Sequence, residues 1–532
     1  MATLAESAGT APTARPLRGF QITIHRLGNP KARTIMETNH ERGMVVDMDG
    51  YGARPQGRQG SENPRSTPGN TSKRSLIVVA NRLPVQQSSG RGMDGPKWQS
   101  ASGGLVTALV PTLKATRGVW VGWNGSSEQK VASFVHDGVA IRPVTLSESD
   151  INGFYNHMSN RTLWPLYHDA IRTPEFDRKH WRPYVEVNRR YARAAARAAN
   201  PGDVVWVHDY HLQLVPAMVR QIRPDVRIGF FLHIPFPPEE IFAWLPWRRE
   251  ILEGLLGADV VGFQTHSAVR NFSRLARRFT STDGTDISLR YDERTVRVGS
   301  WPISIDADWF EKIASDRRTT IPEAAQIRAR LGSGRKILLC VDRLDYTKGI
   351  DARLQAYQLL LQSGKVTVND AVLVQIAVPS RERVADYAHM RTQIERLVGR
   401  INGEYSEPGR VAVHYFRRNY TREELVAFYR AADVMVVTPL RDGMNLVAKE
   451  YVATRYDLSG TLILSEFAGA AEELRRAILV NPRDIEGVAE AMHKAITMPP
   501  GESRHLMGIL RSQVRRHDVY EWADNFLEAL GE

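Results

Sequence analysis

Two cations five residues apart, Arg343 and Lys348, stand in the segment VDRLDYTKGI. Two cations on one loop suit a pyrophosphate, because negative charge grows on its oxygens when it departs as a leaving group. Gly349 follows directly and allows a sharp turn. A basic loop that faces solvent is the alternative interpretation.

A second candidate anion site lies in the segment TPLRDGMNLVAKEYVA. Asp442, Gly443 and Asn445 predict a turn, and the run LVAKE predicts the start of a helix. Free backbone N–H groups at a helix start favour a phosphate. Glu450, inside that first turn, could accept hydrogen bonds from both hydroxyls of a ribose.

A third group of polar residues is centred on the segment VWVHDYHLQLVP. His208, Asp209 and His211 suggest a metal site, but no further cluster with ligand spacing stands nearby. Asp209 could instead cap the following helix or accept hydrogen bonds from sugar hydroxyls. His233, in FFLHIPFPP, follows another apolar run, and a buried histidine with satisfied hydrogen bonds is its alternative interpretation.

The fourth group comes from NRLPV and SASGGLVTALVP. Arg82 ends the apolar run LIVVA, and polar residues at such ends tend to face a ligand cleft. Gly103 and Gly104 precede a predicted helix, where they would permit close approach of an anion. A tight turn without a ligand is the alternative.

Short apolar runs precede most of these polar residues and indicate the elements that must position them. The runs are rich in Val, Ile, Phe and Trp, and most are too short for helices. One series spans residues 76–265 and a second spans 336–482, each alternating with helical stretches. The pattern predicts an α/β fold with two Rossmann-like domains. Ligands of such sheets bind beyond the carboxyl ends of the strands, so we expect the active site in the interdomain cleft.

Four parts of the chain are expected from this pattern and from composition. The first is a flexible extension, because residues 1–74 are rich in Pro, Gly and polar side chains. It is followed by an N-terminal Rossmann-like domain at 75–325 and a C-terminal Rossmann-like domain at 326–495. The last part, 496–532, is expected to form helices that return to the N-terminal domain.

Composition excludes several classes of protein. With 42% hydrophobic residues in 532, wholesale disorder is excluded, and no apolar run is long enough to span a bilayer. The single Cys340 allows neither an internal disulfide nor a cysteine-based metal site, and the N-terminus lacks a secretory pattern, so we expect a cytoplasmic protein. The net charge of +12 suits phosphorylated small molecules better than nucleic acid, because no dense basic run is interleaved with aromatic residues.

Taken together, the motifs resemble those of the trehalose-6-phosphate synthases, retaining glycosyltransferases of the GT-B type with two Rossmann domains. The resemblance implies that the domain at 75–325 binds the acceptor and that the domain at 326–495 binds the nucleotide sugar. The resemblance extends from Leu76 to about residue 530 and rests on NRLPV, SGGL, HDYHL, GFFLHIPFP, GFQT, DRLDYTKG, RINGEY, TPLRDGMNLVAKEYVA and EFAGAAEEL. It implies transfer of glucose from a nucleoside diphosphate glucose to glucose 6-phosphate, giving α,α-trehalose 6-phosphate. UDP-glucose is the expected donor, although the sequence leaves the base open.

Motif positions then imply which residues bind each substrate. The implied donor-binding residues are Gly103, Gly104, Arg343, Lys348, Tyr420, Leu446, Val447, Ala448, Lys449 and Glu450. The implied acceptor-binding residues are Arg82, Tyr155, Trp164, Asp209 and Arg381. Within these sets, Arg82 and Arg381 would clamp the acceptor phosphate. The implied catalytic residues are Arg343, Lys348, Asp442 and His233, the last two touching hydroxyls of the transferred glucose. Tyr420 stands where the family often has another aromatic residue.

The resemblance also implies front-face transfer, in which the donor phosphate accepts the proton of the attacking hydroxyl. A site of cations and hydroxyl-binding groups fits that route better than a pair of carboxylates would. No metal or other cofactor is expected, because Arg343, Lys348 and helix ends already face the diphosphate. The Asp47–Asp49 pair in the extension is interpreted as incidental.

The expected partners are UDP-glucose and glucose 6-phosphate, with no nucleic acid and no membrane, and the enzyme is expected to be a homo-oligomer, dimeric or tetrameric. One alternative is a related synthase with another phosphorylated acceptor, such as glycerol 3-phosphate. Another is a catalytically silent protein that senses sugar phosphates on the same fold. Intact Arg343, Lys348, Asp442 and Glu450 argue against the silent protein.

Overall fold

The computed structural model describes residues 75–87, 98–100, 104–331, 334–381 and 385–531. All of them belong to the unit Thr71–Glu532. The predicted extension at 1–74 lies outside the described residues, as does Gly103.

The first half of the described chain forms a sheet with strand order β10-β11-β12-β9-β8-β7-β1-β4-β6-β5. Its strands are β1 (Leu76–Arg82), β4 (Val119–Trp123), β5 (Phe134–His136), β6 (Val139–Pro143), β7 (Val204–His208), β8 (Arg227–Phe231), β9 (Val260–Phe263), β10 (Asp283–Gly284), β11 (Ser288–Tyr291) and β12 (Arg294–Ser300). Pairing is parallel from β12 through β6 and antiparallel only where β10, β11 and β5 extend the edges. The central strands are buried, as continuous apolar runs between two helical layers require.

The helices of this half are α1 (Gly104–Thr116), α2 (Glu148–Asp150), α3 (Trp164–Tyr167), α4 (Arg178–Ala198), α5 (Val215–Ile222), α6 (Glu239–Phe242), α7 (Arg248–Leu256) and α8 (His266–Phe279). A π-helix, η1 (Ile151–Leu163), and a 3-10 turn, η2 (Tyr210–Leu212), complete it, with a small hairpin of β2 (Val85–Gln87) and β3 (Trp98–Ser100). The π-helix was not foreseen, because its wider turn has no clear periodicity signal in the sequence.

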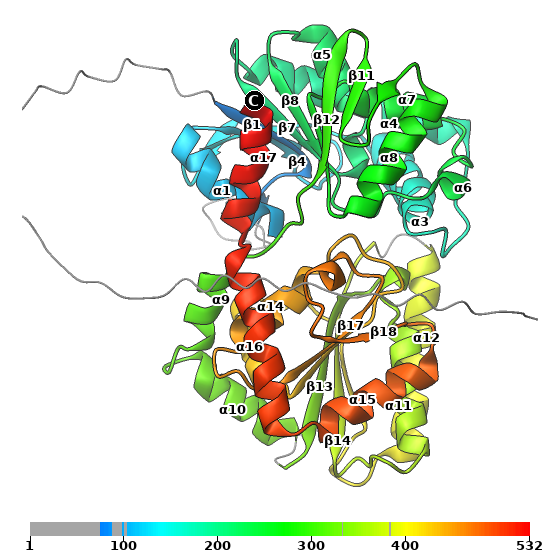
Figure 1. The fold of residues 1–532 in the computed structure, drawn as a ribbon, viewed down its shortest axis with the longest axis vertical. Coiled ribbons are helices and arrows are strands. Elements are labelled where there is room, and N and C mark those ends of the chain that lie inside the picture. Colours follow the sequence, from blue (N-terminus) through cyan, green and yellow to red (C-terminus); the bar gives the residue numbers. More distant parts are fainter. Residues whose placement is uncertain (1–74, 88–97, 101–103, 332–333, 382–384, 532) are drawn as a thin grey trace, which may run out of the picture. The chain divides into compact units, whose positions relative to one another are not determined.

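The second half forms an all-parallel sheet with strand order β15-β14-β13-β16-β17-β18. Its strands are β13 (Lys336–Arg343), β14 (Ala371–Val378), β15 (Val413–Phe416), β16 (Val434–Val437), β17 (Thr461–Ser465) and β18 (Ile478–Val480). Its helical elements are α9 (Ala307–Ala314), α10 (Thr320–Leu331), η3 (Tyr346–Lys348), α11 (Ile350–Gln362), α12 (Ala385–Tyr405), α13 (Arg422–Ala431), α14 (Leu446–Thr454), η4 (Gly469–Glu472) and α15 (Ile485–Thr497). Figure 1 shows the two sheets with helices around each. The predicted α/β fold with two parallel sheets is confirmed.

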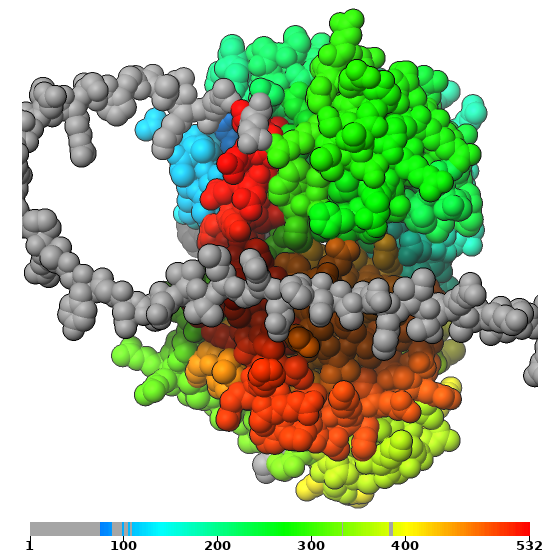
Figure 2. Space-filling view, viewed as in Figure 1, coloured from blue at the N-terminus to red at the C-terminus, as the bar shows by residue number. Residues whose placement is uncertain are grey.

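The last two helices are shared between the sheets. α16 (Pro500–Arg516) packs on α14 and β17, whereas α17 (Val519–Gly531) packs on α1, β8 and β9 of the first sheet. Phe526 of α17 stacks on Trp206 with ring centroids 4.5 Å apart. Gly262 makes room for it, because a Cβ there would lie 2.6 Å from the Phe526 ring. In Figures 1 and 2 these helices run as one red stretch from the second half to the first.

Among the described residues, no helix is both long and apolar enough to cross a membrane.

Candidate active site

The loop after β13 is fixed by a buried arginine. Arg353 is 1% exposed and donates to Asp342 Oδ2 (2.6 Å), to Thr438 Oγ1 (2.8 Å) and to the backbone oxygen of Lys348 (3.1 Å). Gly349 has φ +61°, and a Cβ there would lie 2.5 Å from the Thr438 oxygen. Arg353 and this glycine therefore hold the backbone of Lys348 in one position.

The Lys348 side chain points to the second candidate segment. Its Nζ lies 2.5 Å from Asp442 Oδ2, and Asn445 Nδ2 donates to the same oxygen at 3.1 Å. Burial alone would raise the pKa of Asp442, but the charge and hydrogen bond of Lys348 outweigh burial and lower it. Asn445, with φ +79°, caps α14 by accepting from Ala448 N. The two segments thus meet as a charged pair beside a helix N-terminus.

Asp442 also lies beside His233 of the first half. A Cβ on Gly443 would lie 2.1 Å from the His233 backbone oxygen, so only glycine permits this approach. The His233 ring faces His208, with Nε2 3.2 Å from His208 Nδ1. Burial lowers the pKa of His233 to about 3, so its imidazole is neutral at physiological pH.

Arg381 links the second half to the first. It donates to Asp345 Oδ2 (2.7 Å) and to the hydroxyls of Tyr387 (2.5 Å) and Tyr210 (3.1 Å), and its guanidinium lies 3.8 Å from the Trp164 ring centroid. Asp345 is fully buried. Burial opposes its ionisation, yet the charges of Arg381, Arg343 and Lys348 outweigh burial and lower its pKa to about 2.

The aromatic ring of Trp164 contacts two of the predicted site arginines, Arg343 and Arg381. The guanidinium carbon of Arg343 lies 5.3 Å from the centroid of that ring, which Arg381 also covers. Trp164 is 4% exposed, and its indole nitrogen has no hydrogen-bond partner among the described residues. One ring therefore lies beside both proposed anion sites.

A polar cavity of about 500 Å³ opens beside Arg381. It is lined by Arg82, Trp123, Gly125, Tyr155 and other residues of η1. The Arg82 guanidinium lies over the Trp123 ring at 4.5 Å, and Tyr155 stacks on His211 at 5.9 Å. Two guanidinium groups facing one polar cavity suit a phosphate ester.

The neighbouring cavity, about 430 Å³, contains the polar residues that follow β7 and β8. Asp209, His211 and His233 line it together with Arg82. Asp209 has φ +73° and accepts from His233 N at 3.3 Å. Burial raises the pKa of Asp209 to about 6, although backbone hydrogen bonds and nearby arginines oppose the rise.

The largest cavity, about 890 Å³, is lined from both halves. Ser304 and Asp306 follow β12, and the C-terminal half contributes Arg343, Tyr420, Val447 and Glu450. Glu450 accepts a hydrogen bond from the Tyr429 hydroxyl at 2.8 Å. The size, the aromatic wall and the carboxylate suit a nucleotide.

Several predicted donor residues lie elsewhere. Lys449 is 1% exposed, and its Nζ binds the Ile303 oxygen (2.9 Å) and Glu473 (2.6 Å) rather than facing a cavity. Ala448 is buried and Leu446 does not line the large cavity, so these two could reach a ligand only through their backbone N–H groups. Gly104 begins α1, whose next residues, Leu105 and Val106, line the cavity around Asp209.

Sequence reasoning missed four residues of this site: Trp123, Arg353, Tyr387 and Tyr429. Trp123 ends strand β4, and its position at a strand end was a usable signal. The other three stand inside helices, where nothing in the sequence distinguishes a site residue from a core residue. Among the described residues, no group of three or more His, Cys, Asp or Glu side chains could hold a metal ion.

Comparison with known proteins gives consistent matches. The sequence matches glycosyltransferase family 20 over residues 74–532. It is 55% identical over 465 residues to the trehalose-6-phosphate synthase of Mycolicibacterium smegmatis, covering 86% of this chain and 92% of that protein. The structure is similar to that of a UDP-forming α,α-trehalose-phosphate synthase from Burkholderia xenovorans in complex with glucose-6-phosphate, with a TM-score of 0.78, 35% identity and coverage of 86% and 100%. It is also similar to an E. coli structure named for trehalose-6-phosphate and bound with UDP-2-fluoro glucose, with a TM-score of 0.79, 35% identity and coverage of 86% and 99%.

The raised pKa of Asp209 predicts a pH-dependent cost in stability. The folded protein holds a proton on this group up to about pH 6, whereas an unfolded aspartate releases it near pH 3.9. The group therefore lowers the free energy of unfolding as pH rises through that window. We expect Asp209→Asn to stabilise the ligand-free protein more at pH 8 than at pH 4.5, by about 1–2 kcal/mol in urea titrations. An equal effect at both pH values would show that Asp209 ionises normally.

Proposed function

Because the chain belongs to glycosyltransferase family 20, we propose that it is a UDP-forming α,α-trehalose-phosphate synthase. It transfers glucose from UDP-glucose to glucose 6-phosphate with retention and gives α,α-trehalose 6-phosphate and UDP. One observation carries this proposal: the guanidinium groups of Arg343 and Arg381 both lie against the Trp164 ring. In the proposal, Arg343 binds the donor and Arg381 binds the acceptor. A sugar-phosphate acceptor and a nucleotide-sugar donor together require two such anion sites.

On the donor side, the large cavity accommodates the nucleotide. Glu450 accepts hydrogen bonds from the ribose, and Tyr420 contributes to the wall beside the base. The diphosphate lies between Arg343, Lys348 and the N-terminus of α14, where backbone N–H groups of the LVAKE segment point to an anion. Asp442 orients the Lys348 ammonium, since the two side chains form a partly buried pair.

During transfer, the bond between glucose and the diphosphate stretches and negative charge grows on the leaving oxygen. Arg343 and Lys348 stabilise that charge more than they stabilise the ground state, which lowers the barrier. The neutral imidazole of His233 and the carboxylate of Asp442 bind hydroxyls of the transferred glucose. The donor phosphate accepts the proton of the attacking hydroxyl, so the transfer requires no carboxylate as a base.

On the acceptor side, Arg82 and Arg381 bind the phosphate in the polar cavity, and Asp209 binds hydroxyls of the sugar ring. Tyr155 and Trp164 provide the aromatic walls. A cavity of about 430 Å³ next to the phosphate site favours glucose 6-phosphate over glycerol 3-phosphate, because the smaller acceptor has no sugar ring to fill the cavity and to donate ring hydroxyls to Asp209. The expected homo-oligomer and cytoplasmic location stay predictions.

Replacing the donor cations should slow turnover. We expect Lys348→Ala to lower kcat by about 10²–10³-fold with a smaller change in the acceptor KM. Arg343→Lys should also lower kcat, because the single ammonium of lysine cannot replace a planar guanidinium that donates to two phosphate oxygens. Kinetics of the purified variants, with folding checked by circular dichroism, test this. Lys365→Ala, on an exposed loop, is the control. Near wild-type kcat in both site variants would place the diphosphate elsewhere.

Acceptor choice should depend on the phosphate. We expect glucose to be a very poor acceptor beside glucose 6-phosphate, because it forgoes charge-assisted hydrogen bonds of about 1.5–3 kcal/mol each. Arg82→Ala and Arg381→Ala should each reduce the ratio of activity with glucose 6-phosphate to activity with glucose. Arg82 is the cleaner test, since Arg381 also neutralises the buried Asp345. UDP release measured with each acceptor, glycerol 3-phosphate included, checks this. Equal use of glucose and glucose 6-phosphate by the wild type would contradict it.

The transfer should proceed without a metal ion. Arg343, Lys348 and the start of α14 supply the positive charge that a divalent cation would otherwise bring to the diphosphate. We therefore expect most activity to persist after treatment with EDTA, as measured by UDP release in chelator. Loss of activity in EDTA with recovery on adding Mg²⁺ would contradict this expectation.

A further inference from the structure

The nucleotide cavity contains a buried hydroxyl that the transfer does not use. Tyr429 lies in α13, is 0% exposed, and donates its hydroxyl to Glu450 Oε2 at 2.8 Å. Both side chains line the large cavity. Tyr429 donates to Oε2, so Oε1 of Glu450 can accept from a ligand in the cavity. Burial raises the pKa of the Glu450 carboxylate, whereas the positive charge of Arg422, which lines the same cavity, lowers that pKa and favours the ionised form.

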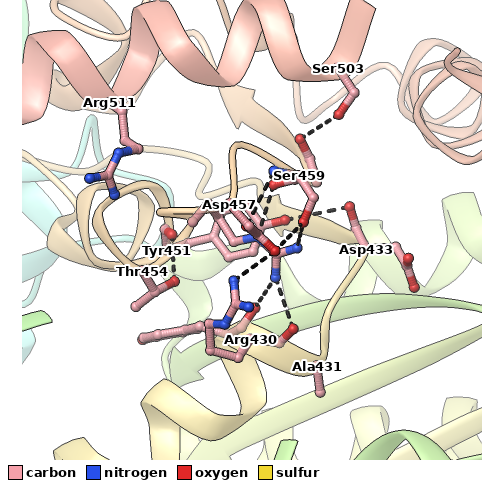
Figure 3. Close-up of polar contacts among 12 residues, drawn as sticks. Arg430, Ala431, Asp433, Tyr451, Thr454, Asp457, Ser459, Ser503 and Arg511 are labelled. Atoms are coloured by element: carbon pink, nitrogen blue, oxygen red, sulfur yellow. Dashed lines mark hydrogen bonds and ion pairs between the residues drawn. The ribbon is translucent and has the colours of Figure 1, made fainter. Parts of the chain in front are cut away.

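The backbone of Tyr429 is held by a polar cluster behind the site. Arg455, just after α14, donates to the backbone oxygens of Tyr429 (3.0 Å) and Arg430 (2.9 Å). Arg430 in turn pairs with Asp457 at 2.9 Å, and Ser459 donates to the same carboxylate at 2.9 Å. Figure 3 shows Arg430, Asp457 and Ser459 of this cluster close together, with their polar contacts as dashed lines. The two helices are therefore fixed relative to one another.

The helix that bears Glu450 is anchored at several further points. Arg511 of α16 donates to the Ala453 oxygen at 2.8 Å, and the Tyr451 hydroxyl contacts the Asp433 oxygen at 3.4 Å. Lys449, beside Glu450, binds the Ile303 oxygen in the segment after β12. With both backbones fixed, the rotamer of the Glu450 side chain is the remaining freedom, and the Tyr429 hydroxyl restricts it.

We propose that Tyr429 is a positioning residue that holds the Glu450 carboxylate for the ribose hydroxyls of the donor, and so gives the enzyme its preference for ribonucleotides over 2′-deoxyribonucleotides. This inference rests on the proposed function. A carboxylate has about four lone-pair positions, and one bond from Tyr429 orients it while leaving the others free. The same bond favours the ionised carboxylate, against the burial that raises the pKa of Glu450.

The test measures the binding of UDP and 2′-deoxy-UDP by isothermal titration calorimetry. Wild-type protein should prefer UDP by about tenfold, because a charge-assisted hydrogen bond is lost with the 2′-hydroxyl. Tyr429→Phe should weaken UDP binding severalfold and 2′-deoxy-UDP binding little, so that the preference falls below about threefold. The variant should fold, since phenylalanine fills the same volume and Glu450 still faces the cavity. Circular dichroism checks this.

Tyr357→Phe is the matched control. It removes another fully buried hydroxyl, which Tyr357 of α11 donates to the Ala371 oxygen at 3.2 Å, away from Glu450 and its helix, and should keep the tenfold preference. Glu450→Gln alone should lower the preference for UDP over 2′-deoxy-UDP. The double variant with Tyr429→Phe should show little further loss of that preference. A purely structural Tyr429 would weaken both nucleotides equally.

Three results would overturn the inference: an unchanged preference in Tyr429→Phe, an equal loss for both nucleotides, or the same selective loss in Tyr357→Phe. Equal binding of the two nucleotides by the wild type would overturn it too. A wild type that binds neither nucleotide would instead contradict the proposed function. The two failures are therefore distinguishable.

Discussion

A carboxylate with no access to water, that of Asp345, sets the arrangement of the site. Its charge must be neutralised where it lies, and Arg381 does so at 2.7 Å. The same guanidinium reaches the Tyr210 hydroxyl and the Trp164 ring of the other half. Removing either partner would leave a buried charge unpaired, so the pair holds the acceptor cation, the loop after β13 and the facing aromatic wall in one geometry.

The donor side depends on a related constraint, the close approach of two loops. Gly443 lies against the His233 backbone, which places Asp442 beside that histidine, and Asp442 then orients Lys348. On the far side, α14 is tied to α16 by Arg511 and to the segment after β12 by Lys449. The helix whose N-terminus we propose as the diphosphate site is therefore attached both to α16 and to the segment after β12.

Lys449 and Arg381 show that the position of a residue in a motif does not determine what its side chain contacts. Lys449 stands in the LVAKE segment, which the sequence predicts to bind the donor, yet its ammonium is buried against Ile303 and Glu473. Arg381 was expected to clamp a phosphate, and the structure adds a buried carboxylate that competes for its guanidinium. A motif is defined by the order of residues along the chain. The direction of a charged side chain depends instead on which oppositely charged group lies near it in the folded protein.

The sequence by itself determined the α/β class, the two parallel sheets and the strand ends that bear polar residues. Continuous apolar runs and strand-end residues are local features, and the long motifs identify the family. Only the tertiary structure decided that Tyr429 contacts Glu450, that Arg353 fixes the Lys348 backbone, and that Trp164 lies beside both Arg343 and Arg381. These contacts join residues that stand apart in the chain, and each depends on burial and charge pairing that exist only after the sheets have packed.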